Sequence, residues 1–75
     1  ANKNDIQARF DLALAYIDVE RHGDATNLLL EIIEKNRNWN EEAARKKLLI
    51  LFDALGPKNE VTIEGRRRLS SIIFS

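Results

Sequence analysis

Apolar and polar residues recur with the period of an α-helix in four successive segments of the chain. Residues that start or stop helices bound each segment, and glycine and proline are almost absent from the interiors. The pattern predicts helices over approximately residues 5–21, 25–36, 39–55 and 60–74. The predicted fold class is all-α, with four helices in two stacked helical hairpins, residues 5–36 and 39–74, within a single domain spanning residues 1–75.

The predicted helix starts are side chains that can accept hydrogen bonds from free backbone N–H groups. They are Asn4, Asp24, Asn38 and Asn59, with Gln7 and Glu41 completing capping boxes at the first and third helices. Gly23 is expected to end the first helix in the left-handed conformation. Gly56 and Pro57 are expected to end the third helix, because proline cannot continue the backbone hydrogen bonding.

The first and third predicted helices are apolar on two sides, which is typical of helices packed between two neighbours. The second stripe of the first helix comprises Ala8, Leu12, Ala15, Tyr16 and Val19, and that of the third comprises Trp39, Ala43, Ile50 and Ala54. The second helix has a single apolar face, formed by Ala25, Leu28, Leu29, Ile32 and Ile33. Stacked arrays usually need about three repeats. One stripe of the first helix is therefore expected to stay uncovered, which favours self-association or marginal stability.

The sequence also contains signs of an internal repeat. Gly23 and Gly56 are 33 residues apart, and aligning them places Ile17 over Ile50. A period near 34 with a helix–turn–helix unit is the spacing of tetratricopeptide repeats.

Two segments carry a more specific resemblance, "WNEEAARKKLLILFDALG" and the closing "GRRRLSSIIFS". From Asp5 to Ser75 the chain resembles the C-terminal region of bacterial thioredoxin-like proteins with a tetratricopeptide tail, the chaperedoxin (YbbN-like) group. The resemblance implies an upstream thioredoxin-fold domain and a holdase or co-chaperone role. The partners that it implies are unfolded clients and a chaperonin or Hsp70-type chaperone, with the last helix associated with chaperonin contact.

Composition excludes several classes of site. The chain has no cysteine and one histidine, His22, so thiolate metal sites and disulfides are excluded and a histidine-based site is not expected. No nucleophile, base and orienting residue form a recognisable set, so we expect neither an enzyme nor a cofactor. The longest apolar run is far shorter than the ~20 residues of a membrane span. Without a visible signal peptide, the expected location is the cytoplasm.

The charges cancel overall but are divided along the chain. Residues 1–36 carry four basic and seven acidic groups, net −3, and residues 37–75 carry eight basic and five acidic groups, net +3. Nucleic-acid domains usually have a positive excess, so no nucleic-acid partner is expected. Arg66, Arg67 and Arg68 point in three directions on a helix, which favours a solvated face.

The candidate partner-binding site lies on the last helix. Its predicted inward face comprises Val61, Gly65, Leu69, Ile72 and Ile73. On the opposite side, at spacings of four, three and four, lie Ile63, Arg67, Ser70 and Phe74. Two exposed apolar residues flanking an arginine can anchor a partner, whereas the alternative is a frayed helix end with isolated exposed apolar residues.

The favoured function is a protein–protein interaction module of a thioredoxin-like co-chaperone. One alternative is a structural or oligomerisation domain. The other is a helix-turn-helix nucleic-acid-binding domain, suggested by the turn at Gly56 before a basic helix.

Overall fold

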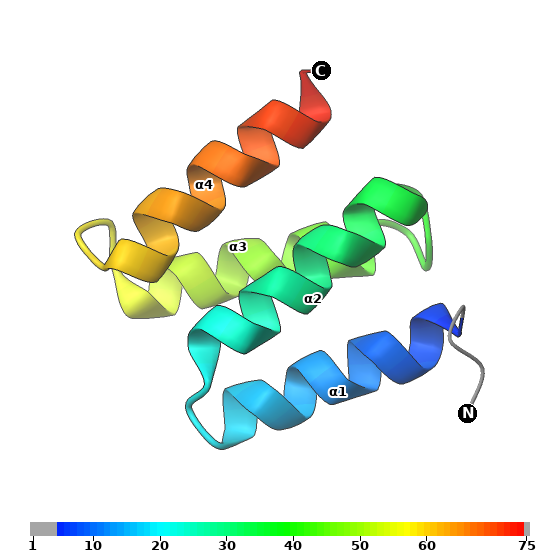
Figure 1. Cartoon of the computed structure of the whole chain (residues 1–75), viewed down its shortest axis with the longest axis horizontal. Coiled ribbons are helices and arrows are strands. Elements are labelled where there is room, and N and C mark those ends of the chain that lie inside the picture. The colour runs from blue at the N-terminus through cyan, green and yellow to red at the C-terminus, as the bar shows by residue number, and fades with distance from the viewer. Residues whose placement is uncertain (1–4, 75) are drawn as a thin grey trace.

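Four α-helices make up the computed structural model, which describes residues 5–74 (Figure 1). They are α1 (Ile6–Asp18), α2 (His22–Lys35), α3 (Ala43–Leu55) and α4 (Glu60–Ile73). α1 and α2 form one hairpin, α3 and α4 form the second, and the described residues contain no strand. The predicted all-α fold with two helical hairpins is confirmed.

Helix α2 is the centre of the molecule. It packs against α1, α3 and α4, whereas α1 packs mainly against α2 (Figure 1). Its buried residues cover a broad arc and are Ala25, Thr26, Leu29, Leu30, Ile32 and Ile33. Four of them, Leu29, Leu30, Ile32 and Ile33, form the main hydrophobic core with Ala13 of α1, Ala44, Leu48 and Phe52 of α3, and Leu69 of α4.

The first turn differs from the sequence prediction. Helix α1 ends at Asp18, and Glu20, not Gly23, takes the left-handed conformation with φ of 60°. The Arg21 N–H donates to the Tyr16 carbonyl at 2.8 Å and the Glu20 N–H donates to that of Ile17 at 3.0 Å, the two hydrogen bonds of a Schellman motif. The Arg21 guanidinium also lies over the Tyr16 ring, 5.2 Å from its centroid.

These contacts end α1 earlier than predicted and start α2 earlier as well. His22, Gly23 and Asp24 form the first turn of α2, so Asp24 is not its N-cap and instead accepts a hydrogen bond from Arg21 Nε at 2.8 Å. Helix α1 is capped by Asp5, whose carboxylate accepts from the Ala8 N–H at 3.1 Å. The predicted cap Asn4 lies outside the described residues.

The connector between the hairpins also departs from the prediction. Asn38 does not cap a helix, because residues 37–42 form turns and α3 begins only at Ala43. Asn40, Glu41 and Glu42 all have positive φ values, between 48° and 62°. The physical reason is Trp39, whose ring packs against Phe10 of α1 at a centroid distance of 5.2 Å and is therefore drawn away from the axis of α3.

The second hairpin follows the prediction closely. Gly56 ends α3 with φ of 91°, a conformation that favours glycine. Asn59 caps α4, since its side-chain oxygen accepts from the Val61 N–H at 2.8 Å. A longer-range contact comes from Arg37, whose Nη2 donates to the Ile72 carbonyl near the end of α4 at 3.1 Å.

The helix ends of the two hairpins are related by shifts of 37 residues (α1 to α3, 43 − 6) and 38 residues (α2 to α4, 60 − 22), not by the 33 suggested by the glycines. A shift of 38 places His22 on Glu60 and Lys35 on Ile73, the ends of α2 and α4. It also carries the inward face of α1, Ile6, Phe10, Ala13, Leu14 and Ile17, onto Ala44, Leu48, Leu51, Phe52 and Leu55 of α3. Gly23 and Gly56 are therefore not equivalent, because one lies inside a helix and the other follows one.

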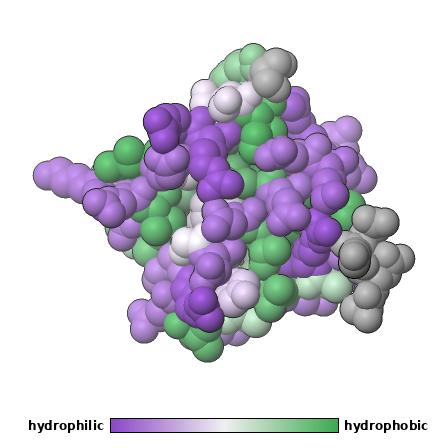
Figure 2. Space-filling model, in the orientation of Figure 1, coloured by the Kyte–Doolittle hydropathy of each residue, from purple (hydrophilic) through white to green (hydrophobic). Residues whose placement is uncertain are grey.

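The expectation that α3 is covered on both of its apolar sides is wrong. Leu12 and Val19 of the second α1 stripe are 46% and 64% exposed, and Ile50 of α3 is 62% exposed. The uncovered α1 stripe was expected, but the exposed flank of α3 was not. On the face drawn in Figure 2, hydrophobic areas lie between hydrophilic ones and do not form one continuous patch.

Gly65 allows α4 to lie close to both α3 and α2. A methyl group at this position would be 2.6 Å from Cε1 of the buried Phe52 ring and 3.3 Å from Cγ2 of Thr26. A real Cβ does not reach the first of these distances, so either the Phe52 ring or α4 would have to move.

We therefore expect Gly65→Ala to lower the free energy of unfolding by about 1–3 kcal/mol, because overpacking outweighs the helix propensity gained. Gly23→Ala is the matched control, since nothing lies within 4 Å of the added methyl. It should leave stability unchanged or raise it by up to about 1 kcal/mol. Urea unfolding followed by circular dichroism measures both. Equal stability of the two variants would contradict the close approach.

Two buried threonines allow a second comparison. Thr26 Oγ1 is buried with no hydrogen-bond partner among the described residues, whereas the Thr62 hydroxyl donates to the Phe52 carbonyl at 3.5 Å. Thr26→Val should raise the free energy of unfolding by about 1 kcal/mol, because an unpaired buried hydroxyl is unfavourable. Thr62→Val should lower it by up to about 1 kcal/mol. A clear loss of stability in Thr26→Val would show that its hydroxyl is paired.

Candidate functional site

The candidate residues lie together on the outer side of α4. Ile63, Arg67, Ser70 and Phe74 are all exposed, with Ile63 at 56% and Phe74 at 84%. The opposite side of α4 packs on α2 and α3 through Thr62, Gly65 and Leu69, which are buried. We call the four exposed residues the α4 outer face.

The α4 outer face packs on no other helix of residues 5–74. Helix α2 has three packed neighbours, α1, α3 and α4, whereas α4 packs mainly on α2 and α3, through its opposite side. The α4 outer face is therefore open to a further helix or a partner segment.

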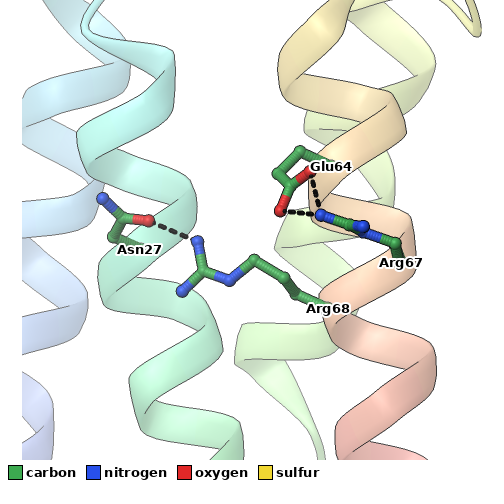
Figure 3. Close-up of polar contacts among 4 residues, drawn as sticks. All are labelled: Asn27, Glu64, Arg67 and Arg68. Atoms are coloured by element: carbon green, nitrogen blue, oxygen red, sulfur yellow. Dashed lines mark hydrogen bonds and ion pairs between the residues drawn. The ribbon is translucent and has the colours of Figure 1, made fainter.

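The three consecutive arginines of α4 have three different contacts, and those of Arg67 and Arg68 are drawn in Figure 3. Arg67 Nη2 donates to both carboxylate oxygens of Glu64 at 2.6 Å. Arg68 reaches across to α2, where its Nη1 donates to Asn27 Oδ1 at 2.6 Å. The Arg66 guanidinium lies 5.6 Å from the centroid of the Phe52 ring. The arginines therefore do not form a single basic patch.

Glu64 changes the electrostatics of the α4 outer face and was missed as part of the site. The hydrogen bond from Arg67, aided by the positive charges of Arg67 and Arg68, lowers the pKa of the Glu64 carboxyl below its ordinary value. The same pair raises the pKa of Arg67. Both side chains are largely exposed, so salt and water screen the pair. The i,i+3 spacing of Glu64 and Arg67 was the available sequence signal.

Two open grooves separate α2 from α4. The larger, about 580 Å³, lies towards the C-terminal ends of both helices and is lined by Ile33, Glu34, Arg37, Ser71 and Ile72. The smaller, about 230 Å³, lies near the N-terminal ends, where Arg68 and Asn27 meet. Among residues 5–74, no cluster of three or more histidine, cysteine or acidic residues could hold a metal.

Two other residues from the sequence analysis, Trp39 and His22, have packed or half-buried positions. Trp39 packs on Phe10, as expected for a packing residue. His22 begins α2 and is half-buried. None of the four helices of residues 5–74 is long and apolar enough to cross a membrane.

The Glu64–Arg67 pair gives a pH-dependent prediction. The Glu64 carboxyl should titrate below the ordinary glutamate value of about 4.3, and Arg67→Ala should raise its pKa towards that value. Because the folded-state pKa is lowered, the stabilisation is present above the unfolded pKa and is lost as pH falls through the folded one. NMR titration of the carboxyl carbon measures the shift. Arg66→Ala is the control, and an equal effect of both variants would contradict the pairing.

Comparison with known proteins places the chain in a family. The sequence profile described as "Tetratricopeptide repeat" matches residues 1–74. Repeats of that family generally mediate protein–protein interactions and are non-enzymatic. No curated protein and no solved structure gave a significant match. With nearly the whole sequence matched and its four helices paired into two hairpins, the chain belongs to the tetratricopeptide repeat family.

Proposed function

We propose that the protein is a docking module that binds a protein partner through the α4 outer face. The observation that carries the proposal is the exposure of two large apolar side chains on one side of α4, Ile63 at 56% and Phe74 at 84%, with Arg67 and Ser70 between them. A partner helix or extended segment that covers Ile63 and Phe74 would bury two large apolar side chains. Burial of such side chains is the main source of favourable free energy in protein association.

The polar residues of the α4 outer face would give the docking its specificity. Arg67 lies between Ile63 and Phe74 along the helix and is already held by Glu64, so its guanidinium is oriented before a partner arrives. A partner carboxylate near Arg67 would share or replace the Glu64 contact. Because the pair is exposed, that exchange has a small desolvation penalty.

The more specific part of the proposal is a co-chaperone or holdase role. It rests on the resemblance of Trp39–Gly56 and Gly65–Ser75 to the tail of thioredoxin-like chaperedoxins. The proposed partners are then a chaperonin or Hsp70-type chaperone, or unfolded clients, in the cytoplasm. The apolar character of Ile63 and Phe74 suits either kind of partner, since both expose or recognise apolar surface.

The nucleic-acid alternative has less support. Arg66, Arg67 and Arg68 contact an aromatic ring, a carboxylate and an amide respectively, and the formal net charge of the chain is zero. Tight binding to duplex DNA depends on several cations that reach phosphates together. The structural or oligomerisation alternative gains support from the exposed stripe of α1, where Leu12 and Val19 lie at the surface.

The test measures binding of immobilised protein to a purified bacterial chaperonin, an Hsp70-type chaperone and a chemically unfolded model protein. Ile63→Ser with Phe74→Ser should weaken binding at least tenfold, because both side chains leave the interface. Ile50→Ser is the matched control, since Ile50 is similarly exposed but lies on α3. The helical circular dichroism and melting curve of both variants should match those of the unmodified chain.

Two outcomes would contradict the proposal. Undiminished binding by the α4 variant would exclude the α4 outer face as the docking surface. Equal losses in the α4 variant and in Ile50→Ser would mean that any exposed apolar residue contributes, which is unspecific adhesion.

A further inference from the structure

We infer that a second copy of this chain docks head to tail, with the α1 stripe of one copy against the α4 outer face of the next. The α1 stripe is here defined as Leu12, Ala15 and Val19, its exposed members. The inference rests on the proposed function, because it assigns a partner to the same α4 outer face. It also uses a second surface that the proposed function leaves unoccupied.

The first observation is that both surfaces are apolar and uncovered. Leu12 and Val19 are 46% and 64% exposed, and Ile63 and Phe74 are also largely exposed. Helix α1 packs mainly on α2, so its far side meets no other helix of the described chain. Each surface therefore offers two large apolar side chains, which would be covered if the surfaces met.

The second observation is their position. Helices α1 and α4 lie at opposite edges of the molecule, with α2 between them (Figure 1). The apolar residues of the α1 stripe and the α4 outer face therefore belong to the two outermost helices. One copy can use both surfaces at once, and a contact between unlike surfaces can continue from copy to copy.

The third observation is charge, which favours the unlike pairing. Exposed Asp11 and Asp18 flank the α1 stripe. Arg67 lies within the α4 outer face, where Glu64 holds it, and Arg66 lies beside that face. Pairing α1 with α1 would bring aspartates together, whereas pairing α1 with α4 brings these aspartates towards Arg66 and Arg67.

The interface is small, so the association should be weak and reversible. Interfaces that bury less than about 1,200 Å² in total are characteristic of weak, transient encounters. Its charged part should respond to salt, because the Debye length falls to about 3 Å at 1 M ionic strength. Self-docking would also occupy the α4 outer face, so it would compete with any other partner of that face.

The test uses two variants of the full chain in sedimentation velocity. Leu12→Ser with Val19→Ser removes the α1 stripe, and Ile63→Ser with Phe74→Ser removes the α4 outer face. The unmodified chain should show a mass that rises with concentration above the 8.6 kDa monomer and falls again at high salt. Each variant alone should stay monomeric at the same concentrations. Their equimolar mixture should form a heterodimer of twice that mass and nothing larger, because it contains one intact copy of each surface.

Several results would overturn the inference. A monomeric unmodified chain at millimolar concentration would do so, as would an equimolar mixture of the variants that stays monomeric. Persistent dimers of the α4 variant would show that α1 pairs with α1, and persistent dimers of the α1 variant would show that α4 pairs with α4. Unchanged circular dichroism spectra and melting curves establish that both variants are folded.

The chaperone-binding measurement separates this inference from the proposed function. Loss of chaperone or client binding in the α4 variant, with a monomeric unmodified chain, would refute self-docking and leave the proposed function standing. Self-association that follows the pattern above, with no chaperone or client binding, would refute the co-chaperone role and leave self-docking standing.

Discussion

The packing of α2 against all three other helices is the interaction on which the rest of the structure depends. Without α2, α1 would lose its main neighbour and the second hairpin would lose its link to the first. Its broad arc of buried residues includes Thr26 and Leu30, which extend beyond the apolar face visible in the sequence. Thr26 lies against Gly65 of α4, so a residue that looks polar in the sequence sits at a closest approach of two helices. The position of α4, and therefore the direction of its outer face, follows from that contact.

Prediction from the sequence succeeded where the helix-capping residues and the tertiary contacts favour the same local structure. In the second hairpin they agreed: Gly56 ended α3, Asn59 capped α4, and the inward and outward sides of α4 were as expected. In the first hairpin they did not. Glu20 took the left-handed position because the Schellman hydrogen bonds and the Arg21–Tyr16 contact favoured it. Gly23 adopts the left-handed conformation more readily than glutamate does, but it lies inside α2.

Periodicity also could not show which apolar stripe is covered. Leu12 and Ile50 have the spacing of buried residues but lie at the surface, because burial depends on which helices are neighbours. The predicted spacing of 33 residues failed because it rested on two glycines in different structural positions, one inside α2 and one after α3, whereas the helix starts of the two hairpins are 37 and 38 residues apart. For the candidate site, azimuth alone identified the exposed residues of α4. The spacing of residues also pointed to Glu64 as a partner of the arginines, but only the side-chain positions show that Arg67 is the one that pairs with it.

The composition of the α4 outer face bears on what kind of contact it makes. If a further hairpin packed there permanently, Arg67 and Ser70 would be buried, and a buried charge is costly unless it is fully paired. If the face served only as solvated surface, Ile63 and Phe74 would be unneeded. A mixture of two large apolar residues with a paired arginine and a serine avoids both extremes. It is sufficiently apolar to gain free energy when covered, and sufficiently polar to remain stable in water when uncovered. Such a face suits the proposed contact, one that forms and dissociates, and the packing of α4 on α2 fixes the orientation of the face.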